Sequence, residues 1–148
     1  MKSIPGAFLV LLLGIVLPLP AEAETGREVV VQSLSGSVEY QKGGEGEWIK
    51  AAPEILLAES DVVRTADNSR CNLLFKGMSN ATVELKPNSM LELATVAEEK
   101  TGDDTQLDLT LGAVLVKADK LKGESAFQVR TPNSIVGIRG TEFEVNVD

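Results

Sequence analysis

The residue types that most often carry catalysis and metal binding are scarce in this chain of 148 residues. It contains no histidine and one cysteine, Cys71. Without histidine there is no Ser-His-Asp or Cys-His catalysis and no histidine-ligated metal, and one cysteine cannot build a zinc or iron–sulfur site. We therefore expect no catalytic residues, no cofactor and no metal site.

Carboxylates are the remaining side chains that could take part in catalysis or metal binding, and the chain holds 22 Asp and Glu residues. A pair of them could serve a carbohydrate-acting enzyme. Most of them, however, lie in loops or alternate with apolar residues, which is typical of a solvated strand face. Asp103 and Asp104 could bind calcium, but the sequence around them lacks the fuller set of oxygen ligands that calcium takes. A protein that is not an enzyme is therefore predicted.

The formal net charge of the chain is −8. An acidic surface repels nucleic-acid phosphates and anionic membrane surfaces. We therefore expect no nucleic-acid partner. A protein partner or a cell-wall glycan remains compatible with this charge.

The first residues have the features of an export signal. Lys2 is followed by an apolar run from Ala7 to Leu17, which is shorter than the ~20 residues of a bilayer span. Pro18 and Pro20 end the apolar segment, and Ala21-Glu22-Ala23 is a small-residue cleavage motif. An uncleaved anchor is the alternative.

These features predict a signal peptide over residues 1–23 and a β domain over residues 24–148. After cleavage the domain would have no stable membrane span, and its location would be periplasmic or secreted. Export implies an oxidising compartment, yet one cysteine cannot form an intrachain disulfide. Because Cys71 alternates with Leu73 and Phe75, we expect an inert thiol in the core rather than a reactive one.

After residue 24 the apolar residues recur at every second position, the pattern of half-buried β-strands. The alternating sets are Val83 and Leu85; Leu91 and Leu93; Leu107, Leu109 and Leu111; Phe127 and Val129; and Phe143, Val145 and Val147. The sequence therefore predicts an all-β fold of short strands.

Turn residues repeat along the same region. Asn68, Asn88 and Asn133 each precede a serine and an apolar strand, and Gly112 occupies an equivalent place between the last two. The successive spacings are 20, 24 and 21 residues, a period of about 22 that indicates stacked repeats. We predict a two-sheeted solenoid or roll-like sandwich, with an antiparallel β-sandwich as the alternative because the same turns could close hairpins.

Trp48 follows a glycine-rich turn and is the chain's one tryptophan. We expect it to cover one end of the core. A role as a platform on which a sugar stacks is the alternative.

The last third of the chain resembles the FecR domain family. The family pattern is Gly-x-Val, then Phe-x-Val-x-Thr-Pro, then Val-x-Arg-Gly-Thr-x-Phe-x-Val. The matching residues are Gly112, Val114, Phe127, Val129, Thr131, Pro132, Ile138 in the valine position, Arg139, Gly140, Thr141, Phe143 and Val145. Upstream, Glu59 to Phe75 is similar to another family segment, with Ser60 where glycine is usual, so the resemblance covers about Val29 to the end.

The resemblance implies an exported, non-catalytic binding or interaction module of the cell envelope. The alternative is a periplasmic signalling component linked to an iron-uptake and sigma-factor system. Family regulators carry a cytoplasmic anti-sigma segment and a membrane helix ahead of this domain, whereas a signal peptide is predicted at that place in this chain. The anti-sigma role is therefore not carried over. The motif residues Thr131, Pro132, Arg139, Gly140, Thr141 and Phe143 are expected to be structural or to contact a partner.

The closing segment also has a structural interpretation of its own. Val136 and Ile138 are even-numbered core positions, whereas Phe143 and Val145 are odd-numbered, so a bulge or sharp turn is predicted at Gly140. The family domain usually continues with another hairpin, so either that hairpin is missing or the chain is a fragment. The last strand would then be an exposed edge, and its acidic residues would disfavour unwanted pairing with other strands.

Overall fold

The computed structural model describes residues 14, 16, 26–138 and 141–147. The predicted signal peptide therefore lies almost entirely outside the described residues, and so do Arg139 and Gly140 with the predicted bulge. Within the described part of the chain, no helix is long and apolar enough to cross a membrane.

Short strands dominate the fold, which confirms the all-β prediction. The strands are β1 (Val29–Ser35), β2 (Val38–Gln41), β3 (Ile49–Lys50), β4 (Leu56–Leu57), β5 (Val62–Thr65), β6 (Arg70–Phe75), β7 (Ala81–Leu85), β8 (Met90–Glu98), β9 (Asp103–Ala118), β10 (Ala126–Arg130), β11 (Ile135–Ile138) and β12 (Thr141–Val147), with a 3-10 turn, η1, at Lys42–Gly44.

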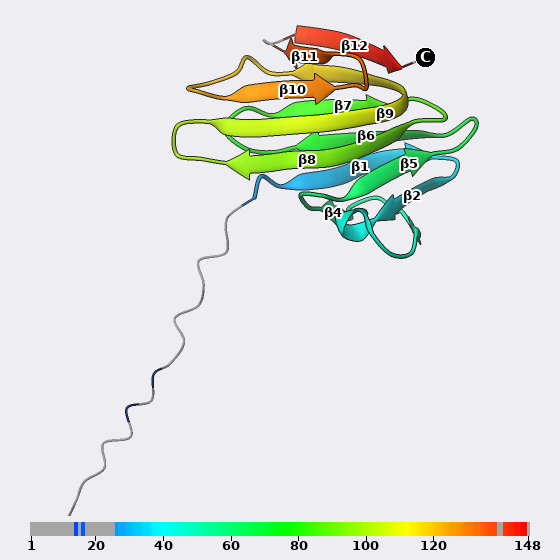
Figure 1. The fold of residues 1–148 in the computed structure, drawn as a ribbon, viewed down its shortest axis with the longest axis horizontal. Helices are drawn as coiled ribbons and strands as arrows, with labels where there is room; N and C mark the ends of the chain where they lie inside the picture. The colour runs from blue at the N-terminus through cyan, green and yellow to red at the C-terminus, as the bar shows by residue number, and fades with distance from the viewer. Residues whose placement is uncertain (1–13, 15, 17–25, 139–140, 148) are drawn as a thin grey trace, which may run out of the picture.

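The strands form two sheets that share strand β9 (Figure 1). Sheet A has the order β3-β2-β5-β8-β9-β10-β11, and sheet B has the order β4-β1-β6-β7-β9-β12. The first part of β9 pairs with β8 and β10, and the part after Gly112 pairs with β7 and β12. The two-sheeted, roll-like prediction is therefore confirmed.

Neighbouring strands run in opposite directions at every described pairing except that of β9 with β10, which is parallel. The chain crosses between the two sheets through bends, and it reverses direction within one sheet through the β6–β7 and β8–β9 hairpins, so successive bent units alternate in direction. The repeat thus takes the roll-like form and combines the predicted stacking with the antiparallel pairing of the alternative.

The bends between the sheets stack on one another at one end of the roll, here called the corner end. Asn68 and Asn88 have positive φ angles of 52° and 54°, as does Gly112 with 83°. Asparagine and glycine are the residues that adopt this left-handed conformation most readily. The predicted corners at these three positions are therefore present.

Serine side chains connect neighbouring corners. The Ser69 hydroxyl accepts a hydrogen bond from the backbone N–H of Ser37 (2.9 Å), and the Ser89 hydroxyl accepts one from Ala113 (3.0 Å). A Cβ added at Gly36 would overlap Ser69, and one added at Gly112 would overlap Ser89. The asparagine–serine pairs thus do two jobs, since the asparagine makes the bend and the serine binds the next corner.

Two details of the repeat prediction are wrong. Asn133 does not make a corner, because β10 and β11 are both in sheet A and form a hairpin around it. Leu111 is 54% exposed rather than buried, because it directly precedes the corner at Gly112, where the strand leaves sheet A. Gly36, with φ of 75°, makes a further corner that the asparagine–serine pattern does not reveal.

The inward rows of the two sheets share one aliphatic core. Its largest fully buried side chains include Phe75, Phe127, Leu73, Leu85, Leu91, Leu93, Leu107 and Leu109. The rings of Phe75 and Phe127 meet edge to face with 5.8 Å between their centroids. Cys71 is fully buried among these residues, as the alternation predicts.

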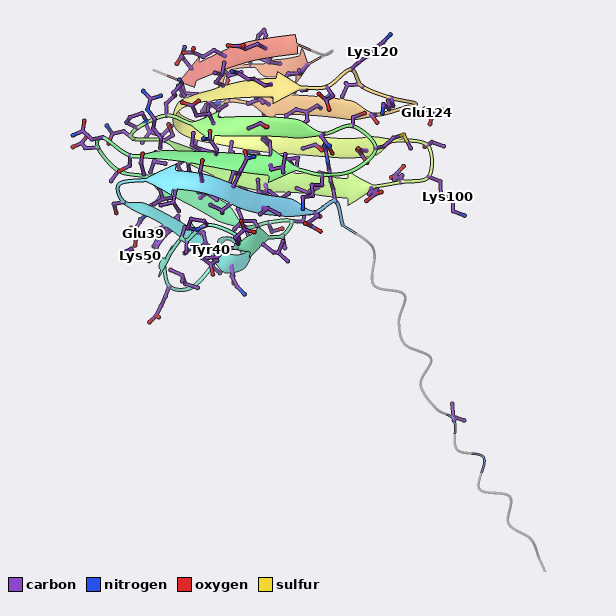
Figure 2. The ribbon with its side chains drawn as sticks, turned by 180° about the vertical axis from the view of Figure 1, so that it is seen from behind. Glu39, Tyr40, Lys50, Lys100, Lys120 and Glu124 are labelled. Carbon is purple, nitrogen blue, oxygen red and sulfur yellow. The ribbon has the colours of Figure 1, made fainter. Side chains whose placement is uncertain are left out.

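The longer connections gather at the opposite end, here called the loop end, where Figure 2 shows Lys100, Lys120 and Glu124 together. Backbone hydrogen bonds join three of these loops: Asp119 N–H donates to Asn80 O (2.9 Å), and Glu124 N–H donates to Thr101 O (2.8 Å). The loop end is therefore a connected layer and not a set of separate hairpin tips.

Candidate functional site

The family-motif residues at Thr131 and Pro132 form the hairpin turn between β10 and β11. The Thr131 hydroxyl accepts a hydrogen bond from the backbone N–H of Ser134 (3.1 Å), and Thr131 N–H donates to Ser134 O (2.8 Å). Pro132 is exposed at the tip. These contacts account for the threonine as a turn-forming residue.

Phe143 and Thr141 belong to β12, the terminal strand of sheet B. The backbone of Thr141 pairs with Ala118, and that of Phe143 pairs with Val116. Phe143 is 42% exposed although its row also contains the buried Val145. The motif therefore ends on a partly uncovered aromatic side chain at the rim of the core.

The structure places the described motif residues at two separate points. The Thr131–Pro132 turn follows β10 at the corner end, next to Thr110. Strand β12 begins at the loop end, because Thr141 pairs with Ala118. The motif thus outlines the C-terminal border of the roll, made by β11 and β12, and its described residues do not converge on one pocket.

A buried polar cluster at the loop end was not predicted from the sequence. Arg27 is 4% exposed, and its guanidinium donates to Thr105 Oγ1 (2.6 Å), to Lys76 O (3.1 Å) and to Ser79 O. Its Nε lies 4.0 Å from a carboxylate oxygen of Asp103. Arg27 therefore ties the start of β1 to the loop before β7 and to β9.

The electrostatics of this cluster follow from its burial. Desolvation lowers the pKa of Arg27 from its usual value, while the nearby charges of Asp103 and then Glu98 oppose that shift. Asp103 Oδ2 accepts a hydrogen bond from Ser79 N–H (2.8 Å), and Asp103 Oδ1 has no hydrogen-bond partner among the described residues. A carboxylate beside a buried guanidinium is best understood as a structural counter-charge.

The suggestion that Asp103 and Asp104 bind calcium together is not supported by their geometry. They are successive residues of β9 and therefore point to opposite faces, with Asp103 buried and Asp104 exposed. Across the described residues, no group of three or more Asp, Glu, Cys or His side chains could hold a metal ion.

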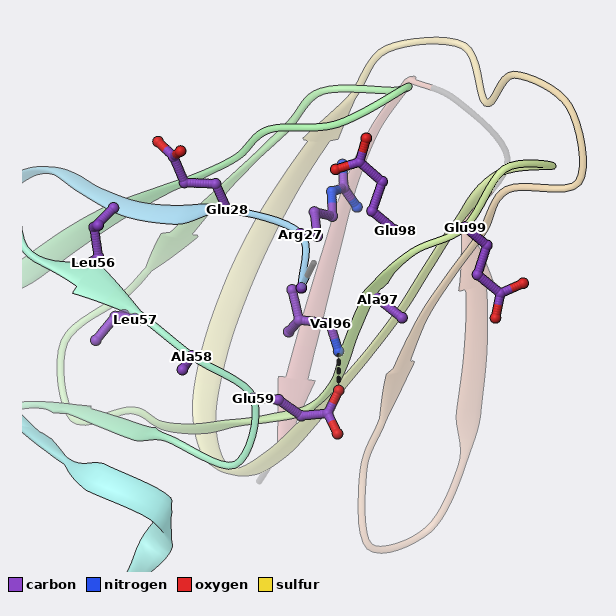
Figure 3. Close-up of a pocket in the computed structure, with 11 residues that line it drawn as sticks. Arg27, Glu28, Leu56, Leu57, Ala58, Glu59, Val96, Ala97, Glu98 and Glu99 are labelled. Atoms are coloured by element: carbon purple, nitrogen blue, oxygen red, sulfur yellow. Dashed lines mark hydrogen bonds between the residues drawn. The ribbon is translucent and has the colours of Figure 1, made fainter. Parts of the chain in front are cut away.

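A groove of about 830 Å³ lies where β1 begins, bordered by β4 and the end of β8 (Figure 3). Its lining residues are Gly26, Arg27, Glu28, Leu56, Leu57, Ala58, Glu59, Val96, Ala97, Glu98 and Glu99. Leu56 is 63% exposed beside the groove. An apolar residue among acidic side chains suits a peptide segment better than a nucleotide or another anion.

Two of the acidic side chains in the groove already have partners. Glu59 Oε2 accepts a hydrogen bond from the backbone N–H of Val96 (3.0 Å), and Glu28 lies 2.9 Å from the ammonium of Lys76. A glycosidase needs one carboxyl group held as an acid and a second held as a base or nucleophile. These contacts tie the two carboxylates to different parts of the fold and not to each other, so they do not form such a pair.

Trp48 does not cover the core in the manner expected from the sequence. Its ring lies under the guanidinium of Arg64, with 3.8 Å between Arg64 Cζ and the ring centroid. Arg64 also pairs with Glu39 (3.0 Å) on the outer surface of sheet A. One face of the ring is therefore covered by a cation, which weakens its case as a sugar-stacking platform.

The comparisons with known proteins give one result. The model of the family described as "FecR protein" matches residues 61–148. The match spans β5 to β12, including the corners at Asn68, Asn88 and Gly112. No curated protein and no solved structure matches the chain.

Proposed function

Because this chain belongs to the FecR family, we propose that it is an exported, non-catalytic interaction module of the cell envelope. The family points to a signalling-related role in the periplasm and to a protein that is not an enzyme. The observation that carries the proposal is the family match over the repeated corners and the C-terminal border. In this function the roll is a rigid support that presents its border strands and loops to a partner.

A protein partner accounts for the surface better than a cell-wall glycan does. Ile135 is 66% exposed, Leu56 is 63% exposed and Phe143 is 42% exposed, and all three lie on border strands of the sheets. Apolar side chains at such positions are typical of protein contacts. A glycan would instead be expected to use an uncovered aromatic face, and Arg64 covers one face of Trp48.

The second candidate is a signalling component that passes the ligand status of an outer-membrane receptor to a separate membrane protein. The family match favours it, since regulators of ferric-citrate uptake give the family its name. A sigma-factor gene and a TonB-dependent receptor gene beside the coding gene would support this version. If these two genes are absent, the signalling version loses its support and the interaction module is unaffected.

Site-specific photo-cross-linking in cells tests the proposed function. A photoreactive residue is placed at Phe143 on the C-terminal border, at Leu56 beside the groove, or at Glu45 on the turn after η1. We expect a discrete adduct with an envelope protein from Phe143 or Leu56 and a weaker or absent adduct from Glu45. Cell fractionation verifies that each variant is in the periplasm.

The outcomes separate the alternatives. An adduct from either position supports the interaction module, and its position identifies the surface. Folded periplasmic protein without an adduct at any position, but retained on insoluble peptidoglycan, would favour the glycan partner. Absence of both results would contradict the proposed function.

A further inference from the structure

The groove at the start of β1 has an apolar side chain in a position that a partner can reach. Figure 3 shows Leu56 and Leu57 of β4 on one side of the groove and Val96 and Ala97 of β8 on the other. Leu57 and Val96 are buried, being 5% and 2% exposed, whereas Leu56 is 63% exposed. A segment that lies along the groove would therefore remove the apolar surface of Leu56 from water while the core stays as it is.

The cation in the lining does not determine the charge of the groove. Arg27 is the one cationic residue among the described residues that line it, and it is buried. The carboxylate of Asp103 lies 4.0 Å from Arg27 Nε and matches its charge. The carboxylate of Glu28 is likewise matched, because it lies 2.9 Å from the ammonium of Lys76. These four residues together contribute no net charge.

The other acidic residues give the groove a negative charge. Three exposed carboxylates in the lining make no ion pair within the described part of the chain, and they belong to Glu59, Glu98 and Glu99. The hydrogen bond from Val96 N–H (3.0 Å) holds the Glu59 carboxylate against β8, and Glu98 is the last residue of that strand. A positively charged ligand is therefore favoured here.

We propose that this groove binds an extended segment of a partner protein that carries an apolar residue and, close to it in sequence, lysine or arginine. The apolar residue contacts Leu56 on the β4 side, and the basic residues pair with the carboxylates at the end of β8. The proposal rests on the interaction function proposed above and specifies its surface and the chemistry of its partner.

Neither end of this chain is a good occupant of the groove. β4 and β12 lie at opposite borders of sheet B, so a strand that followed β12 would be added on the far side of the sheet. At the N-terminus, the predicted cleavage after Ala23 leaves Glu24 and Thr25 ahead of Gly26. Two residues, one of them acidic, are a poor match for an acidic groove of about 830 Å³.

A second copy of this chain is also a poor occupant. The segment Lys120-Leu121-Lys122 has the required pattern of basic and apolar residues. Leu121, however, packs against the core of its own chain, and the backbone N–H of Lys122 donates to the Ser79 hydroxyl (2.8 Å). A second copy would have to break these contacts before it could bind.

The test uses the exported protein, with its N-terminus at Glu24 verified by mass spectrometry, and two synthetic peptides. The lysine peptide is Ser-Lys-Val-Leu-Lys-Ser, and the glutamine peptide has glutamine in place of each lysine. Binding is followed by the amide NMR signals of β4 and the end of β8. We expect the lysine peptide to bind roughly fivefold more tightly, the scale of two exposed ion pairs, and the preference to shrink as salt is added.

Two variants with the same change of net charge locate the effect. In Glu98→Gln/Glu99→Gln the preference for the lysine peptide should fall to about twofold or less, because these carboxylates no longer pair with it. In Glu45→Gln/Glu47→Gln, whose exposed side chains lie outside the groove lining, the preference should be kept. An unreactive Cys71 thiol shows that each variant is folded.

Leu56→Ser tests the apolar part of the proposal. Leu56 is largely exposed, so the substitution leaves the core intact. We expect both peptides to bind roughly fivefold more weakly, because each loses the same apolar contact, and the preference for lysine to be unchanged. Unchanged affinity in this variant would mean that the groove attracts cations only, which would overturn the proposal.

Four further results would also overturn it. They are equal affinity for the two peptides, an equal loss of preference in both glutamine variants, NMR changes confined to another surface, and no binding of either peptide to the folded protein. Self-association that protects the groove would identify a second copy as the occupant, with the same consequence.

The two proposals can fail separately. A cross-link from Phe143 alone, together with no peptide binding in the groove, would leave the interaction module in place and move its contact surface to the C-terminal border. A cross-link from Leu56 together with the lysine preference supports both.

Discussion

Cys71 shows how one buried side chain reports on the whole fold. It is fully buried, and desolvation raises the pKa of its thiol to about 12. Because the thiolate is the reactive form, we expect labelling by a thiol reagent to be slow in the native protein and fast in denaturant. Equal rates in the two states would show that β6 is not packed as described.

The same thiol should contribute to the pH dependence of stability. In the unfolded chain the thiol ionises near its usual pKa of 9.0, whereas in the folded protein it keeps its proton up to a pKa of about 12. Its contribution is therefore complete below pH 9 and is lost as the pH rises from 9 toward 12. We expect the urea midpoint of the wild-type protein to fall more steeply over this interval than that of Cys71→Ala. Parallel pH profiles would contradict the assignment.

Arg27 is the residue whose loss should be most costly at the loop end. In Arg27→Met the carboxylate of Asp103 remains buried without its counter-charge, which costs roughly 3–5 kcal/mol of unfolding free energy. The double variant Arg27→Met/Asp103→Leu should recover much of this loss, because no charge remains buried. Urea denaturation measures both.

Arg130→Met is the matched control for Arg27. Arg130 makes a two-pronged pair with Asp108, with distances of 3.0 and 2.6 Å, but on the exposed surface of sheet A. Exposed ion pairs contribute little, so its urea midpoint should change little. A similar loss in both variants would mean that burial does not determine the effect.

At the scale of elements, the corners make a quantitative prediction about glycine. In Gly112→Ala the alanine would have to keep a φ of 83°, and its Cβ would overlap Ser89. We therefore expect the free energy of unfolding to fall by roughly 3 kcal/mol. Gly43 has a φ of 63°, but a Cβ added there would meet no atom within 4 Å. Gly43→Ala should therefore lower the free energy of unfolding by only about 1–2 kcal/mol, the cost of the left-handed backbone alone. Thermal or urea unfolding of the two variants separates backbone strain from overlap.

Gly137→Ala completes the comparison, because a Cβ there meets no atom within 4 Å and the residue does not have a positive φ. Its stability should be close to that of the wild-type protein. If Gly112→Ala proves equally benign, the stacking of Ser89 on the corner does not stabilise the roll.

The sequence predicts an element well where the backbone conformation depends mainly on the residue itself. Asn68 and Asn88 were expected to make turns and do so with left-handed backbones, because this conformation depends mainly on the residue itself. Asn133 lies between a proline and a serine, as Asn88 does, but it belongs to a hairpin. Whether the strand after a turn pairs in the same sheet or crosses to the other depends on distant partners, which local sequence does not contain.

The candidate site was harder to predict for the same reason. Phe143 was identified from the family motif, because the motif is a local pattern in the sequence. Arg27 was missed, although its place two residues before Val29, in the same alternating row as the first buried residue of β1, is a weak signal of a buried side chain. Its acceptors at Ser79 and Thr105 are 52 and 78 residues away in the chain.

At the scale of the whole molecule, the predicted signal peptide leaves very little chain ahead of the fold. Cleavage after Ala23 would leave three residues before Arg27, whose side chain is already buried. We expect mass spectrometry of the exported protein to show an N-terminus at Glu24, because the small residues at Ala21 and Ala23 follow a short apolar run. Exported protein that retains Met1 would contradict the prediction and favour the membrane anchor.

The strand order also has a consequence for how the chain acquires its structure. The hairpins that join β6 to β7, β8 to β9 and β10 to β11 connect neighbours in the sequence, and they can form early because little loop entropy is lost. Strand β1 has no such neighbour, since Val29 pairs with Leu57 and Phe75. A chain that crosses a membrane with its N-terminus first would keep β1 without β4 until residue 57 had followed, and without β6 until residue 75 had followed. The buried contacts of Arg27 would be completed later still, because its acceptor Thr105 lies on β9.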